Sequence, residues 1–209
     1  MSVSYKMVVD DDRCITSKRA LRAILYTSFT NKRLGMDNTI KLAEQFAQDY
    51  ALHKHVFATA ESCTGGLISA SITAVSGSSA WFDRSFITYT NKAKMEMLGV
   101  SEEALGSYGA VSEIVACMMV KGALKGSDAD IAVAVTGIAG PTGGSQEKPV
   151  GTVYIAFKRR CDEHCFVKRH LFNGDREQVR HSTVCEALNG LLTLSASKSL
   201  QEAGYSIVS

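Results

Sequence analysis

The sequence contains no apolar run long enough to cross a membrane. Its long apolar stretches, such as Ile131 to Val135, have the length of a β-strand and fall short of the roughly 18 residues that a spanning helix needs. The first residues also lack the basic and apolar regions of a secretory signal, so we expect none. We therefore expect a soluble, cytoplasmic protein whose six cysteines stay reduced.

The sequence also has little excess of either charge. Its 23 Lys and Arg residues face 21 Asp and Glu residues, which gives a formal net charge of +2 at pH 7. No overall field therefore attracts nucleic acid or an anionic membrane, and we expect neither as a partner. With 209 residues, the chain suits one domain with a sizeable core.

Two common nucleotide-binding motifs and a convincing metal motif are missing as well. The glycine-rich stretch after residue 136 is neither a Walker A loop nor a Rossmann fingerprint. Cys161 and Cys165 lie near His164 and His170, but their spacing differs from that of zinc knuckles and straddles an expected hairpin. We expect no metal ion and no other cofactor.

Short apolar runs alternate with helical patterns from Met36 onward. We expect strands at residues 55–60, 84–89, 129–135, 151–157 and 165–171, and helices from 36 and at 65–74, 91–98, 112–125 and 175–194. This alternation is typical of α/β proteins, and the hairpin between the last two strands favours a mixed sheet.

The compact domain is expected to cover residues 36–209. Residues 1–35 mix an acidic triplet with basic residues and show no period that joins them to the helical pattern starting at Met36. Two interpretations stay open for this segment: an extension poorly tied to the core, or a surface helix around Ser17 to Phe29.

A serine stands at the first expected strand-to-helix turn, in the stretch AESCTGG at residues 60–66. Ser62 there could act as a nucleophile, because the free backbone N–H groups that open a helix can stabilise an oxyanion. The amides around Thr64 and Gly65 are the candidates for that support. The alternative is that Ser62 or Thr64 merely caps the helix. Cys63 is a second possible nucleophile, but no histidine is placed to activate it, and we favour a packed thiol.

The stretch TYTNKAK at residues 88–94 supplies a possible base. A lysine with a pKa lowered by burial can accept a proton from a serine hydroxyl. Lys92 and Lys94 point away from each other on a helix, so at most one can face Ser62. The alternative is that both are solvated, and that Tyr89 beside them is half-buried packing.

A third group of candidate residues consists of a glycine-rich loop and an arginine that comes later in the chain. Thr136 and Gly137 begin this loop at the end of a strand, where open α/β sheets bind ligands. Arg176, just after a turn, suits a bidentate phosphate contact. The loop could equally be a tight solvent turn, and the arginine a surface residue.

These blocks together resemble the C-terminal domain family of the competence-associated protein CinA. The resemblance runs from about Met36 to the end, on AESCTGG, GSSAWFDRSFITYTNKAK, GAVSE, VAVTGIAGPTGGSQEKPVGTVYIAF and FNGDR. It implies a single three-layer α/β/α domain with a mixed, largely parallel central sheet. It also implies hydrolysis of nicotinamide mononucleotide to nicotinic acid mononucleotide and ammonia, in pyridine nucleotide salvage.

The resemblance assigns roles residue by residue. It implies that Ser62 is the nucleophile, that Lys94 rather than Lys92 is the base, and that Tyr89 assists proton transfer. It makes Thr136 and Arg176 contacts of the ribosyl phosphate.

A competing interpretation keeps the fold without the chemistry. The chain would then be a non-catalytic nucleotide-binding or competence-associated interaction domain. In either case we expect a small-molecule pyridine mononucleotide as ligand and, by analogy with relatives, a homo-oligomer.

Overall fold

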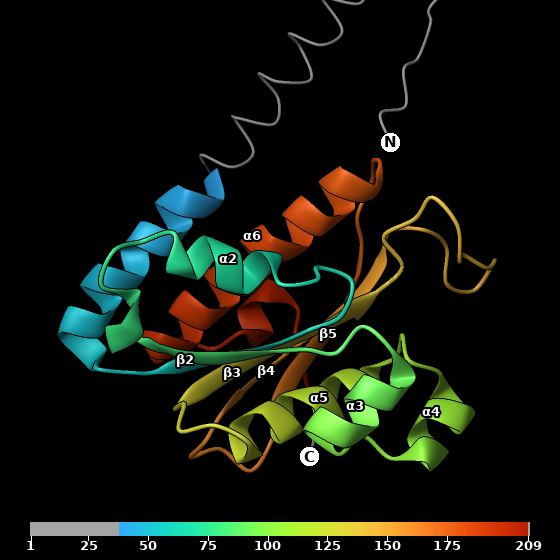
Figure 1. Ribbon diagram of the computed structural model, residues 1–209, viewed down its shortest axis with the longest axis horizontal. Helices are drawn as coiled ribbons and strands as arrows, with labels where there is room; N and C mark the ends of the chain where they lie inside the picture. Colours follow the sequence, from blue (N-terminus) through green and yellow to red (C-terminus); the bar gives the residue numbers. More distant parts are fainter. Residues whose placement is uncertain (1–37, 209) are drawn as a thin grey trace, which may run out of the picture. The chain divides into compact units, whose positions relative to one another are not determined.

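The computed structural model describes residues 38–208 (Figure 1). The two interpretations of residues 1–35 lie outside these described residues, and the domain start near Met36 stays a prediction. Within residues 38–208, no helix is long and apolar enough to cross a membrane.

Helices and strands alternate through the first two thirds of this region, and the expected elements are present with small shifts at their ends. Residues 38–53 are helical. The elements after this helix are β1 (Phe57–Glu61), α2 (Leu67–Thr73), the short 3-10 helix η1 (Ser78–Ala80), β2 (Phe82–Ile87), α3 (Asn91–Leu98), α4 (Glu102–Tyr108), α5 (Glu113–Lys125), β3 (Ile131–Gly137), β4 (Thr152–Arg159), β5 (Cys165–Leu171), α6 (Arg176–Ser195), η2 (Gln201–Ala203) and β6 (Ser206–Val208).

The strands form one mixed sheet of six strands in the order β2-β1-β3-β4-β5-β6. β1 pairs in parallel with β2 and with β3, whereas β3 to β6 pair antiparallel to one another. The α/β class and the mixed sheet are therefore confirmed. The expectation of a largely parallel sheet needs correction, because three of the five pairings are antiparallel. Two of these pairings arise because the loops after β3 and β4 return the chain beside the strand it has just left, and the third forms where β6, after α6, adds to the edge at β5.

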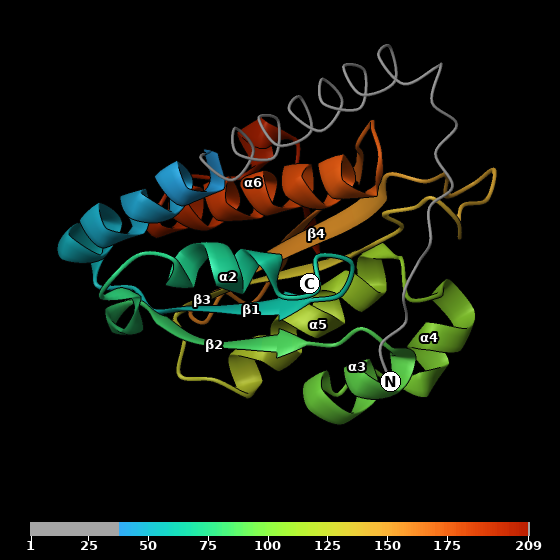
Figure 2. The same cartoon turned by 45° about the horizontal axis from the view of Figure 1, so that its top comes forward.

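Helices cover both faces of this sheet and create two separate cores (Figures 1 and 2). The helix at residues 38–53, α2 and α6 lie on one face, and α3, α4 and α5 lie on the other. β3 shows how the sequence divides the layers: Ile131, Val133 and Val135 belong to the first core, and Ala132 and Ala134 to the second. The small alanines allow α5 to approach the sheet closely.

Besides the two short 3-10 helices, the sequence reasoning missed one helix and one strand. α4 is only seven residues long and exposes most of its surface, so it carries little apolar periodicity. β6 has three residues and forms the sheet edge, with an exposed Ile207. Neither segment has the length that a pattern requires.

The parallel half of the sheet brings three strand ends to one edge. β1, β2 and β3 run in the same direction, so the segments after Glu61, Ile87 and Gly137 leave the sheet side by side. Ligands of open α/β sheets bind at such carboxyl ends. The serine turn, the lysine helix and the glycine-rich loop all begin here.

We predict that Gly122→Ala destabilises the fold. A Cβ atom at Gly122 would lie 2.1 Å from the carbonyl oxygen of Leu98, where α5 crosses the end of α3. Overpacking of this kind costs about 1–3 kcal/mol of unfolding free energy, which urea denaturation can measure.

Gly106→Ala is the matched control, because a Cβ atom there meets nothing within 4 Å. Alanine in a helix should raise stability by up to about 1 kcal/mol. Equal stability changes in the two variants would contradict the close crossing.

Candidate active site

Ser62 lies at the point where β1 ends and the chain turns toward α2. Its N–H donates to the carbonyl of Val135 at 3.1 Å, so it continues the parallel pairing with β3. The chain then reverses through Gly65 and Gly66, whose φ angles of 61° and 96° favour glycine. Ser62 is only 8% exposed and is therefore buried at the end of β1.

The capping alternative for Ser62 does not describe this turn. Gly66 is the N-cap residue of α2 and makes no side-chain cap. The carboxylate of Glu61 instead accepts the first N–H groups of the helix. The hydroxyl of Ser62 is therefore free for another partner, and that partner is a lysine.

Lys94 donates from Nζ to the Ser62 hydroxyl at 2.9 Å and to the carbonyl of Thr88 at 2.8 Å. Thr90 caps α3 by accepting the amide of Ala93, which places Lys94 one turn into the helix and toward the sheet. Lys94 is 1% exposed, and burial lowers the pKa of its ammonium below the usual 10.5, against a smaller opposite effect of Cys63. A lowered pKa favours the proton-accepting role that the sequence predicts for Lys94.

Lys92 occupies the opposite side of the same helix. It is exposed and lies 3.6 Å from Glu96, its i,i+4 neighbour. The geometry therefore separates the two lysines, one facing the serine and one facing solvent.

Cys63 comes directly after Ser62 but is a packed thiol. It belongs to the core beneath α2, and burial raises the pKa of its thiol to about 12. Since the thiolate is the reactive form, Cys63 is a weak nucleophile at neutral pH.

Tyr89 and Arg176 meet at the solvent side of the strand edge. Arg176 opens α6 and donates to the hydroxyl of Tyr89 at 2.8 Å and to the carbonyl of Gly140 at 2.7 Å. Tyr89 is 59% exposed, so it is not buried packing, and the hydrogen bonds of the Lys94 amine go to Ser62 and Thr88 instead. The arginine links the segment between β2 and α3 to the glycine-rich loop.

Thr136 and Gly137 lie beside the serine turn at the end of β3. Val135 pairs with Glu61, so Thr136 comes next at the level of Ser62. Its hydroxyl donates to the carbonyl of Ala110 at 2.8 Å. A Cβ atom at Gly137 would lie 2.6 Å from the Val153 side chain, which gives this glycine a packing reason of its own.

The amide of Gly65 is already engaged within the protein. Its N–H donates to the carbonyl of Ser62 at 3.1 Å. An oxyanion role for this amide therefore requires a change of partner, and the same role for the amide of Thr64 stays a prediction.

Two residues of the site were missed from the sequence, Glu61 and Arg180. Arg180 stands one turn after Arg176 on α6 and donates to the carbonyl of Thr64 at 2.6 Å. The i,i+4 spacing of the two arginines was the available signal. Glu61 gave none, because an acid inside an apolar run indicates only the end of a strand.

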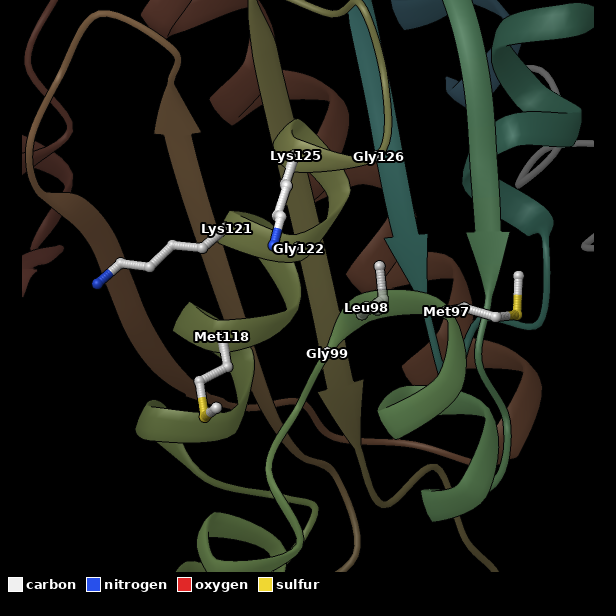
Figure 3. A pocket seen from close by; sticks show the side chains of 8 residues that line it. All are labelled: Met97, Leu98, Gly99, Met118, Lys121, Gly122, Lys125 and Gly126. Carbon is white, nitrogen blue, oxygen red and sulfur yellow. The ribbon is translucent and has the colours of Figure 1, made fainter.

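A groove of about 520 Å³ lies elsewhere, between the end of α3 and α5 (Figure 3). Its lining residues are Met97, Leu98, Gly99, Met118, Lys121, Gly122, Lys125 and Gly126, and none of them is a predicted site residue. No group of three or more His, Cys, Asp or Glu residues suited to a metal occurs within residues 38–208.

Comparison with known proteins shows that this chain is similar to CinA and PncC proteins. The family model of the CinA C-terminal domain matches residues 39–195. The nicotinamide-nucleotide amidohydrolase PncC of Escherichia coli K12 is 50% identical over 152 residues, which cover 73% of this chain and 92% of the relative. The protein of the same name from Pseudomonas putida is 48% identical over 159 residues, or 76% and 98% of the two chains.

Solved structures agree with the sequence relatives. The competence/damage inducible protein CihA from Agrobacterium tumefaciens superposes with a TM-score of 0.73 at 47% identity, over 75% of this chain and 95% of that one. The competence damage-inducible protein A from Klebsiella pneumoniae gives a TM-score of 0.72 at 37% identity, over 76% and 97%.

We predict that Cys63 resists alkylation while the protein is folded. Iodoacetamide at pH 8 should modify the exposed Cys161 and leave Cys63 free until denaturant is added, because its thiol is buried and its pKa is about 12. Mass spectrometry of peptides resolves the two sites. Modification of Cys63 as fast as Cys161 in the native protein would contradict its buried position.

Proposed function

Because the chain belongs to the CinA C-terminal domain family, we propose that it hydrolyses the carboxamide of nicotinamide mononucleotide to nicotinic acid mononucleotide and ammonia. The protein would then be a hydrolase that acts on a carboxamide C–N bond. We propose that the reaction serves pyridine nucleotide salvage. The sequence relatives named nicotinamide-nucleotide amidohydrolase support this choice of substrate.

The contact between Lys94 and Ser62 carries the chemical part of the proposal. An amine buried in the protein lies 2.9 Å from a serine hydroxyl, which is the geometry of a base and its nucleophile. A non-catalytic binding domain would have no need to bury a lysine beside a serine, where desolvation costs free energy.

The first half of the reaction forms an acyl-enzyme. The Ser62 oxygen attacks the carboxamide carbon while its proton passes to the neutral Lys94 amine. When the tetrahedral intermediate collapses, the C–N bond breaks and Lys94 returns the proton to the leaving nitrogen as ammonia departs.

The second half releases the acid. Water attacks the ester carbon and gives a proton to Lys94, which returns it to the Ser62 oxygen as the ester bond breaks. Tyr89 assists these proton transfers in our proposal. The amides of Thr64 and Gly65 stabilise the oxyanion, and the Gly65 amide leaves the carbonyl of Ser62 to do so.

The substrate's phosphate is the proposed partner of Arg176. The planar guanidinium of Arg176 can donate two hydrogen bonds to one phosphate. The substrate phosphate would then replace the hydroxyl of Tyr89 and the carbonyl of Gly140 as its acceptors. Thr136 and Gly137 are proposed to contact the ribosyl phosphate end from the neighbouring strand. A cytoplasmic location and a homo-oligomer stay predictions.

Ser62→Ala and Lys94→Met should each lower kcat for nicotinamide mononucleotide by at least about 10³-fold, because the two side chains act as one unit. The double variant should lose little more than either single one. Ammonia release measured by a coupled assay gives the rates, and Lys92→Met should match the wild type because Lys92 faces solvent.

The alternative functions have distinct outcomes in the same assay. Wild-type protein that releases no more ammonia than Ser62→Ala favours a binding domain. Activity that survives Ser62→Ala and disappears in Cys63→Ala makes Cys63 the nucleophile.

Arg176→Ala should raise KM for nicotinamide mononucleotide by about 10- to 100-fold, the value of a hydrogen bond to a charged group. The effect on nicotinamide riboside, which has no phosphate, should be much smaller. Steady-state kinetics on both substrates make the comparison, and Arg84→Ala, an exposed arginine on β2 paired with Asp83, is the control. Equal effects on the two substrates would remove the phosphate role.

A further inference from the structure

Glu61 is a fully buried acid immediately before the proposed nucleophile, and the mechanism above does not use it. Six donor groups lie within hydrogen-bond distance of its carboxylate. One oxygen accepts the hydroxyl of Thr64 at 2.7 Å and the amides of Gly66 at 2.9 Å and Ile68 at 3.1 Å. The other accepts the amide of Ser69 at 2.8 Å and lies 3.3 Å from the hydroxyls of Thr59 and Ser85, which also bond to each other, so one of the two is left to donate to it.

Most of these donors belong to the segment that leads from the nucleophile into α2. Thr64, Gly66, Ile68 and Ser69 span the turn after Ser62 and the first residues of that helix. Glu61 itself is held in β1 by pairing with β2 and β3. The carboxylate thus ties a glycine turn, which has many accessible backbone conformations, to the paired strands of the sheet.

A second contact, from Arg180 of α6, holds the same turn. Thr64 donates its hydroxyl to Glu61, while its carbonyl accepts from Arg180 of α6 at 2.6 Å. Ser62 therefore lies between two fixed points, Glu61 before it and Thr64 after it.

The carboxylate does not contact the Ser62 hydroxyl or the Lys94 amine. Its effect on the reaction must act through the turn. Small displacements of a nucleophile cost much of its reactivity, because a misplacement of about 1 Å can reduce a rate by about 100-fold.

We propose that Glu61 is a positioning residue, whose carboxylate holds the turn from Ser62 to Ser69 so that the serine hydroxyl faces Lys94. This rests on the proposed function, and it assigns to Glu61 a part in kcat rather than in substrate affinity. Glutamine at this position keeps the shape but replaces one accepting oxygen with an NH₂ group, which faces donors and cannot accept from them.

The first measurement is steady-state kinetics of Glu61→Gln with nicotinamide mononucleotide. We expect kcat to fall about tenfold or more while KM changes by less than about twofold, the pattern of a misplaced reacting group. Asp130→Asn is the matched control, because Asp130 accepts the amide of Val56 at 2.8 Å at the opposite end of β1. That variant should lose stability without losing kcat.

The second measurement does not depend on the substrate. A small fluorophosphonate reacts when the serine oxygen forms a bond to phosphorus, fluoride leaves and the hydroxyl proton passes to the base. The rate of modification of Ser62, measured by mass spectrometry, should fall in Glu61→Gln by about the same factor as kcat. Thr64→Val, which removes the shortest hydrogen bond of the Glu61 carboxylate, should slow the modification as well.

Each outcome decides the proposal. If Glu61→Gln loses stability but keeps both rates, Glu61 is only a helix cap and the proposal is wrong. If Glu61→Gln does not fold, the modification rate of Thr64→Val decides, and a wild-type rate overturns the proposal. Wild-type protein that is modified at Ser62 but hydrolyses no nicotinamide mononucleotide disproves the proposed function alone. Absence of wild-type modification at Ser62 overturns the role of Glu61 as well.

Discussion

A buried lysine without a carboxylate partner is the interaction on which the rest of the site depends. Among residues 38–208, Lys94 forms no ion pair, and its amine contacts only the Ser62 hydroxyl and the Thr88 carbonyl. Burial of an unpaired charge is costly, so burial lowers the pKa of Lys94. In the proposed mechanism, the absence of a counter-ion beside Lys94 thus favours its role as the base.

The sheet explains how this amine and this hydroxyl come together from distant parts of the sequence. β1 and β2 are parallel neighbours, so Ser62 leaves one strand beside Thr88, which leaves the other. Thr88 supplies both the carbonyl that accepts from Lys94 and the start of the segment leading to α3. An antiparallel pair would carry the two segments to opposite ends. The parallel half of the mixed sheet is therefore the half that builds the site.

The sequence predicted the helices and strands that are long enough to show a hydrophobic period. It also predicted the site residues that lie in short sequence motifs. The helical period alone shows that Lys92 and Lys94 face opposite ways, and the resemblance chose Lys94, the one that the structure buries. It could not give the carbonyl of Thr88 as a partner, since every residue has one. It also missed Glu61, whose donors come from both sides of the chain and from another strand. Such contacts depend on the tertiary fold and leave no local pattern.

Glu61 and Lys94 both lie close to Ser62 but form no ion pair with each other, because each has other hydrogen-bond partners. A carboxylate close to Lys94 would hold the lysine in its charged form and raise its pKa. Glu61 is one residue from Ser62, but its oxygens are occupied by amides and hydroxyls of β1, β2 and the turn into α2. The donors that fix the turn also compensate the buried negative charge, so Glu61 needs no cation. In the proposed mechanism, the placement of this one carboxylate therefore serves both the position of Ser62 and the lowered pKa of Lys94.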